Sequence, residues 1–171
     1  MIYGVYHIED DIYTKDTGVY GKSLFAKRDF KSGELVFLAY GLIVTSPNLY
    51  TIPIDWNLYI EPRVPDGNLC QYVCHSCEPN LGIKHRNMFV AMRDIATDEE
   101  VTIDYAMIVY EYRHIIPKDG GRVCKCGRKT CRGQFGAFTE LTPELKEKYA
   151  GYISDFLLGP PQEIHFPATF G

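Results

Sequence analysis

Long apolar runs are absent from this 171-residue sequence, which nowhere has eighteen consecutive apolar residues, so we expect no membrane-spanning helix. The N-terminus MIYGVYHIEDD lacks the basic region and apolar run of a secretory signal, so export is not expected. Long basic runs are also missing and the net charge is −4, which argues against direct nucleic-acid binding. These absences predict a cytosolic protein, or a nuclear one if the source is eukaryotic.

What is present favours one globular domain. The length is sufficient to bury an ordinary core, and 46% of the residues are hydrophobic. Six cysteines in a chain that is not exported are expected to be reduced thiols or metal ligands rather than a disulfide framework. A mildly acidic protein would also suit a basic peptide partner.

Short strands separated by turn residues dominate the pattern. Residues 23–29 lead into a turn at KSGE, and residues 35–44 form a long apolar run that is interpreted as one or two buried strands around a bend at Gly41. Residues 88–95 and 101–108 predict two strands joined by the acidic loop ATDEE. The expected fold class is mostly β with few helices.

A single helix is predicted near the C-terminus. Thr142 is its expected N-cap, Pro143 its first residue, and Gly159 its end. An apolar stripe from Leu145 to Leu157 runs along it, and we interpret this stripe as core packing.

The segment CKCGRKTC places three thiols within eight residues, in a stretch with no apolar periodicity of its own. Three thiolates at this spacing, Cys124, Cys126 and Cys131, can wrap one tetrahedral zinc ion, and a closed structural site needs a fourth ligand. No further Cys or His lies within a few residues. The alternative interpretation is three reduced surface cysteines, or an adventitious disulfide.

The remaining cysteines, Cys70, Cys74 and Cys77, lie in or beside the stretch QYVCHSCEPN. We therefore expect the fold to bring the cysteine-rich tail onto this segment. A cysteine nucleophile is another interpretation of the stretch, but His75 beside it in sequence does not establish a paired base, and we reject that interpretation.

Four segments together resemble the SET-domain protein lysine methyltransferases, in the order and spacing of that family. GKSLFAKRDFKSGE resembles the cofactor-binding turn and the strand after it. HSCEPN resembles the Asn-His-Ser-Cys-x-Pro-Asn motif, and DEEVTIDY the Gly-Glu-Glu-x-x-x-Asp-Tyr motif. CKCGRKTCRG resembles the post-SET zinc loop.

The resemblance implies a SET-domain β-fold with a pseudoknot, a short post-SET zinc loop and a C-terminal helix. It places the SET domain at residues 1–115, the post-SET zinc loop at 116–138, and the C-terminal helix and tail at 139–171. In zinc-bearing members the motif cysteine, here Cys77, supplies the fourth ligand of a structural zinc.

The resemblance also implies methyl transfer from S-adenosyl-L-methionine to a lysine ε-amine of a protein or peptide, with histones as one candidate substrate. Tyr105 is the expected catalytic residue, which orients the amine. The expected cofactor-binding residues are Tyr20, Gly21, Lys22, Ser23, Gln71, Cys74 and His75. The expected walls of the substrate channel are Ile103, Phe135 and Tyr40.

Ile103 lies two residues before Tyr105, where family members carry Phe or Tyr as a product-specificity switch. A Tyr there donates a hydrogen bond and favours monomethylation, whereas Ile donates none and leaves more room. The resemblance therefore predicts a protein that adds more than one methyl group.

Four positions depart from the family pattern, one of them Gln134, where an aromatic residue often follows Cys-Arg-Gly. Cys74 replaces the leading Asn of its motif, Gln71 replaces an Arg, and Ser23 replaces the second Gly of the cofactor turn. These last three support a rival hypothesis, a catalytically silent SET-like module that binds proteins. A third hypothesis is a bare zinc-binding interaction domain.

Overall fold

A computed structural model of the chain describes residues 8–62, 69–112 and 121–160. The expected boundary between residues 115 and 116, and the tail after residue 160, lie outside these ranges.

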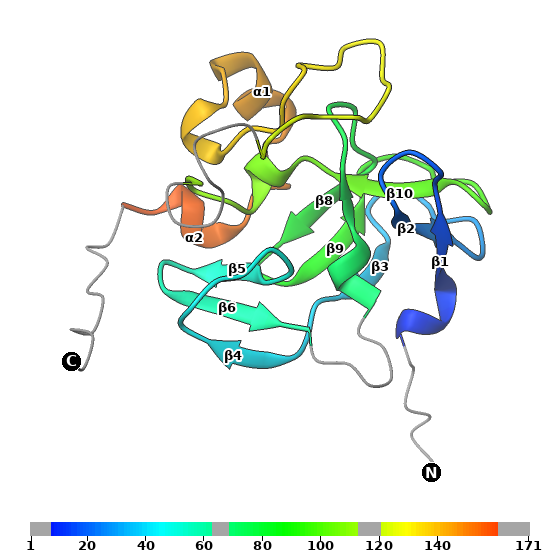
Figure 1. The fold of residues 1–171 in the computed structure, drawn as a ribbon, viewed down its shortest axis with the longest axis horizontal. Helices are drawn as coiled ribbons and strands as arrows, with labels where there is room; N and C mark the ends of the chain where they lie inside the picture. Colours follow the sequence, from blue (N-terminus) through cyan, green and yellow to red (C-terminus); the bar gives the residue numbers. More distant parts are fainter. Residues whose placement is uncertain (1–7, 63–68, 113–120, 161–171) are drawn as a thin grey trace.

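Short strands form most of the regular structure, which confirms the mostly β expectation (Figure 1). The strands are β1 (Ile12–Asp16), β2 (Lys22–Ala26), β3 (Leu35–Leu38), β4 (Leu42–Val44), β5 (Ile52–Asp55), β6 (Leu58–Glu61), β7 (Cys74–His75), β8 (Leu81–Lys84), β9 (Met88–Ala91) and β10 (Glu100–Ile103). The helices are the 3₁₀ turns η1 (Ile8–Asp11), η2 (Leu69–Tyr72), η3 (Tyr105–Met107) and η4 (Phe138–Glu140), with the α-helices α1 (Pro143–Lys148) and α2 (Asp155–Leu158). Within the described ranges, no helix has the length and apolar character needed to cross a membrane.

The larger sheet has the strand order β1-β2-β10-β8-β9-β3, and β7 also pairs with β10. Its buried side chains form much of the core, in which the rings of Phe37 and Phe89 stack with their centroids 4.4 Å apart. Fully buried aromatic rings of this kind contribute much of the apolar area that stabilises a small domain.

A second sheet, with the order β4-β6-β5, lies below the larger one in Figure 1. The bend predicted inside residues 35–44 is present, because Gly41 separates β3 from β4 at φ 158°. A Cβ atom at Gly41 would lie 2.2 Å from the Glu61 carbonyl oxygen, so only glycine fits there. The prediction that this whole segment is buried was wrong for β4, whose Leu42 and Ile43 are 44% and 57% exposed. β4 pairs with β6 at the edge of the small sheet and contributes little to the core.

The C-terminal segment begins as predicted, since the Thr142 side chain caps α1 and Pro143 is its first residue. The prediction of a single long helix was wrong. α1 ends at Lys148, Gly151 has φ +79°, and α2 begins only at Asp155. A positive φ cannot continue an α-helix, so the chain turns there. The apolar stripe is nevertheless buried, from Tyr149 at 0% exposure to Leu157 at 2%, which confirms its interpretation as core packing.

Strand β10 lies at the centre of the region that carries the expected site. It pairs in parallel with β7, so that Thr102 is opposite Cys74 and Ile103 opposite His75. It also pairs in parallel with β8 through Leu81. The motifs HSCEPN and DEEVTIDY are therefore neighbours in space, while the pseudoknot itself stays a prediction.

Candidate active site and metal centre

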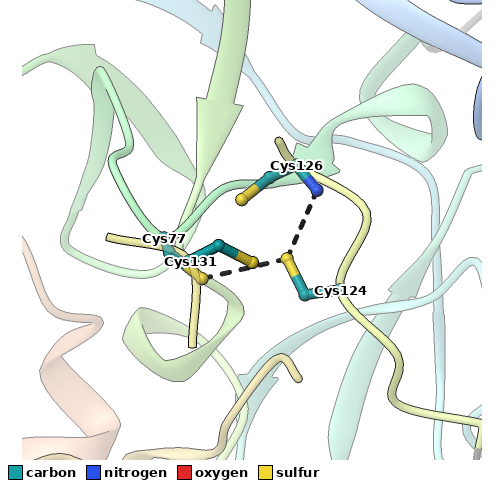
Figure 2. Close-up of side chains that lie close together, drawn as sticks. All are labelled: Cys77, Cys124, Cys126 and Cys131. Carbon is teal, nitrogen blue, oxygen red and sulfur yellow. Dashed lines mark hydrogen bonds between the residues drawn. The ribbon is translucent and has the colours of Figure 1, made fainter. Parts of the chain in front are cut away.

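Four cysteine sulfur atoms converge on one point, as Figure 2 shows. Those of Cys77, Cys124, Cys126 and Cys131 all lie within 4.8 Å of one another, and those of Cys77 and Cys124 are 3.8 Å apart. A tetrahedral zinc with Zn–S bonds of about 2.3 Å has sulfur–sulfur edges of about 3.8 Å. The four thiols therefore fit a structural zinc, which stays a prediction.

Hydrogen bonds hold the cysteine-rich tail against the segment that follows β7. The backbone N–H of Thr130 and its hydroxyl both donate to Glu78, at 2.9 and 2.8 Å. The backbone N–H of Arg132 donates to the sulfur of Cys77 at 3.4 Å. The expectation that the tail folds onto the stretch around Cys77 is confirmed.

Burial and hydrogen bonds shift the thiol pKa values in opposite directions within the cluster. Burial raises the pKa of Cys77 and of Cys124. Burial would also raise the pKa of Cys126, but hydrogen bonds from neighbouring groups outweigh it and lower that pKa to about 7. Four thiolates so close together would repel one another, so a bound cation is required for all four to ionise.

His75 lies between the thiols and the aromatic rings. Its Nδ1 accepts the backbone N–H of Tyr105 at 3.3 Å, which leaves the hydrogen on Nε2, 3.4 Å from the Cys77 sulfur. Burial lowers the pKa of His75 to about 4, and Arg132 adds to that effect although Asp104 opposes it. The neutral ring can therefore donate to a thiolate ligand, as a supporting group for a metal site does.

Asp104 connects three parts of the chain. Its fully buried carboxylate accepts hydrogen bonds from Arg132 Nη2 at 2.6 Å and from the Tyr149 hydroxyl at 2.9 Å. The backbone N–H of Ala106 donates to it as well, at 3.1 Å. One carboxylate thus ties the cysteine-rich tail and the residue after helix α1 to the end of β10.

Two cavities meet at a pair of aromatic residues. One, of about 280 Å³, is lined by residues 48–53 and by Gln71, Val73 and Tyr112, among others. The other, of about 340 Å³, is lined by Tyr20, Cys74, His75 and the tail residues 123–126. Tyr105 and Phe135 line both cavities, and their rings make an edge-on contact at 5.4 Å.

The Tyr105 hydroxyl is held in place by the backbone, since it donates to the Val73 carbonyl at 3.0 Å. Burial raises its pKa well above the usual range, so the phenol is neutral under ordinary conditions. With its proton engaged by Val73, the oxygen retains lone pairs that accept from a group at the meeting point of the cavities.

The expected cofactor-binding residues do not all line one cavity. Tyr20 lines the larger cavity, and its hydroxyl donates to Glu100 at 2.7 Å. Gly21 forms a turn at φ +88°, the Lys22 carbonyl accepts from the Cys74 thiol at 3.5 Å, and Ser23 is fully buried. Gln71 lines the smaller cavity instead.

The expected channel residues also separate. Phe135 lies where the two cavities meet, whereas Ile103 is fully buried and lines neither of them. Tyr40 is 53% exposed and lines a third cavity with Arg86 and Asn87. The structure therefore brings only Phe135 of these three to the position of Tyr105.

Several residues at the site had no assigned role from sequence. Asp104 belongs to the motif DEEVTIDY, and nothing else in the sequence indicated its role. Arg132 follows the last cysteine directly, and Tyr149 belongs to an apolar stripe. Tyr112 carried no signal that separates it from the other tyrosines of the chain.

The chain is similar to one known family and to several known proteins. A family model described as SET domain matches residues 21–106, about half of the chain. The histone-lysine N-methyltransferase trithorax of Drosophila virilis is 31% identical over 136 residues, which cover 67% of this chain and 3% of that protein. The human histone-lysine N-methyltransferase 2B is 28% identical over 138 residues, covering 68% of this chain and 5% of that protein. The chain therefore spans only a small part of the length of these relatives.

Solved structures share the fold. The crystal structure of KRYPTONITE in complex with mCHG DNA and SAH matches with a TM-score of 0.59 and 21% identity, covering 73% of this chain and 29% of that chain. A second KRYPTONITE structure, with mCHH DNA, H3(1-15) peptide and SAH, matches with a TM-score of 0.60 and 23% identity over the same shares.

Proposed function

Because the chain belongs to the SET-domain family, as its motifs predicted, we propose that it is a protein lysine N-methyltransferase that uses S-adenosyl-L-methionine. The substrate is a lysine ε-amine of a protein or peptide. The chain matches only a small part of each relative. Its activity, substrate and partners are therefore proposals.

The observation that carries the proposal is the pair of cavities that share Tyr105 and Phe135. Methyl transfer by in-line displacement needs the amine and the leaving sulfur on opposite sides of one carbon. A site with two compartments that share Tyr105 and Phe135 suits that geometry, and such positioning can supply about 7–11 kcal/mol in favourable cases. We assign the lysine to the cavity with Tyr112, and the cofactor to the cavity with Cys74 and His75.

The reacting lysine must be neutral. A free lysine with a pKa near 10.4 resists deprotonation at pH 7 by about 4.6 kcal/mol, and burial beside Tyr105 and Phe135 lowers that pKa. When bound, S-adenosyl-L-methionine supplies a methyl group on a positively charged sulfur. The Tyr105 oxygen, fixed by its hydrogen bond to Val73, accepts an N–H of the amine. This contact directs the lone pair of the amine nitrogen toward the cofactor cavity.

Zinc has a structural part in this proposal. Four thiolates leave no open position on a tetrahedral ion, so the metal takes no part in the transfer. Its ligands Cys124 and Cys126 line the cofactor cavity themselves, with Lys125 between them. Metal binding therefore fixes one wall of that cavity and also positions Phe135.

Histones are the first substrates to test, because the relatives are named histone-lysine N-methyltransferases. The net charge of −4 also favours a basic peptide. A histone substrate would place the protein with chromatin in a eukaryotic nucleus. The comparisons give no support to the cytosolic location expected from the sequence.

Labelled methyl transfer tests the proposal. Zinc-loaded protein is incubated with labelled S-adenosyl-L-methionine and either core histones or a proteome extract. The proposal predicts label on lysine in protein. Absence of label on every lysine would contradict it.

The silent-module hypothesis is separated from this proposal by calorimetry. Cys74 does line the cofactor cavity in place of the family's Asn, and burial raises the pKa of its thiol, although Ser23 opposes the effect. Binding of S-adenosyl-L-methionine to zinc-loaded protein supports the enzyme, and no binding supports the silent module.

A further inference from the structure

The turn before β5 exposes two neighbouring apolar side chains to solvent. Leu49 is 71% exposed, more than any other large apolar side chain in the described part of the chain, and Tyr50 is 62% exposed. Single exposed apolar residues are ordinary on a protein surface, but two adjacent ones form a continuous apolar patch. Residues 35–54 contain no charged residue, so this stretch supplies no charge beside the patch.

Hydrogen bonds within the turn fix its shape. The backbone N–H of Tyr50 donates to the side-chain oxygen of Asn48 at 2.8 Å, and the Thr51 hydroxyl donates to the Asn48 carbonyl at 2.9 Å. The backbone N–H of Thr51 donates to the same carbonyl at 3.3 Å. A turn closed in this way is already ordered before a ligand binds, so contact with its side chains costs little conformational entropy.

The patch of Leu49 and Tyr50 lies at the open end of the smaller cavity, which we assign to the substrate lysine. Both residues line that cavity together with Val73 and Ile108, which are buried. The exposed pair therefore marks the end of the cavity that opens to solvent. None of the described residues that line this cavity is charged. A peptide whose lysine enters the cavity leaves the residues beside that lysine against the patch.

We propose that Leu49 and Tyr50 are specificity-determining residues of the methyl transfer, and that they select a lysine with an apolar residue directly beside it in the substrate. The inference rests on the proposed function. An apolar neighbour loses contact with water against the patch, which stabilises the complex, whereas a charged neighbour loses hydration there and finds no partner. The net charge of −4 attracts basic peptides over longer distances and does not choose the residue beside the lysine.

A set of peptides that differ at one position tests this assignment. The sequence around the lysine comes from a protein that the wild type labels, and the residue on each side of the lysine is in turn Leu, Ser, Arg or Asp. We expect Leu on one of the two sides to raise kcat/KM about tenfold over the other three, the factor that partly burying such a side chain supplies. The gain should lie in KM, because this contact is the same before and during the transfer.

Leu49→Asp is the sharpest variant, because it puts a carboxylate in the apolar patch. The preferred neighbour of the lysine should then change from Leu to Arg. Leu158→Asp is the matched control: Leu158 is 61% exposed, lines neither cavity, and its substitution changes the net charge equally. It should keep the preference for Leu. Both positions are exposed, so both variants should keep the melting temperature near that of the wild type.

A change of preference to Arg in Leu49→Asp, with Leu still preferred in Leu158→Asp, supports the assignment. Equal kcat/KM for all four neighbours on both sides, in a wild type that methylates the peptide, would overturn this inference while the proposed function stands. An unaltered preference for Leu in Leu49→Asp would overturn it too. If the wild type transfers no methyl group to any lysine, the proposed function fails and this inference fails with it.

Discussion

Replacing Arg132 by Leu separates a buried carboxylate from its only cationic partner in the described residues. Asp104 is 0% exposed, and Arg132, 28% exposed, donates to it at 2.6 Å. After the substitution Asp104 retains its bonds from the Tyr149 hydroxyl and from the backbone of Ala106. The charge remains buried but is no longer neutralised.

The size of the effect follows from this geometry. Removing one partner of a buried ion pair usually destabilises a protein by about 3–5 kcal/mol. The two remaining hydrogen bonds and the partial exposure of Arg132 favour the low end, about 3 kcal/mol. For a chain of this size that loss lowers the melting temperature by about 6–12 °C.

Arg122→Leu is a matched control. Arg122 is 29% exposed, almost the same as Arg132, but its partner Glu140 is 45% exposed. A surface pair of this kind contributes about 0–1 kcal/mol, so the melting temperature should fall by less than about 4 °C. The two variants thus differ chiefly in the burial of the carboxylate, although the Arg132 side chain also hydrogen-bonds the Cys77 thiol, so zinc content is measured in both.

The assay is thermal unfolding of zinc-loaded protein followed by circular dichroism. Adding Asp104→Asn to Arg132→Leu should recover part of the loss, because the buried charge is then gone. If Arg132→Leu lowers the melting temperature no more than Arg122→Leu does, the structural role given to Asp104 is refuted.

Two further substitutions test the metal centre and the packing of the C-terminal segment. Cys77→Ser removes one of four zinc ligands, so the purified variant should lose zinc in elemental analysis, whereas Cys74→Ser should keep it; equal zinc contents would contradict the four-cysteine site. Gly82→Ala places a Cβ 2.5 Å from the Tyr152 side chain and should destabilise the fold by about 1–3 kcal/mol in urea unfolding, since overpacked sites cannot relax freely. Gly136→Ala, whose nearest neighbour would be a side-chain oxygen at 3.4 Å, should change stability little, and equal losses in both variants would argue against the packing described.

Local chemistry explains what could be predicted from the sequence. The cap at Thr142 and the bend at Gly41 depend on single residues whose conformational preferences are strong. The three cysteines of the tail needed a fourth ligand, and that shortage alone indicated the segment around Cys77. The cap and the bend are visible because neighbours in sequence decide them, and the partner segment of the tail is visible because all the other cysteines lie there.

The rest depended on residues distant in sequence. The break between α1 and α2 lies at Gly151, whose positive φ interrupts the helix while the apolar pattern continues across it, so the pattern alone favoured one helix. Tyr112 lines the smaller cavity together with Phe135, which is 23 residues later in the chain and contacts its ring at 5.5 Å. The exposure of Tyr40 likewise depends on the small sheet, which no local pattern describes.

The most direct test of the account is the rate of methyl transfer by Tyr105→Phe on a lysine that the wild type labels. The variant keeps the ring between the two cavities but loses the oxygen held by Val73. Loss of one preorganised polar contact to the reacting group should slow transfer about 100-fold or more, with zinc content and melting temperature near those of the wild type. Transfer at the wild-type rate by a folded, zinc-loaded Tyr105→Phe protein would contradict the assignment of this boundary as the place of reaction.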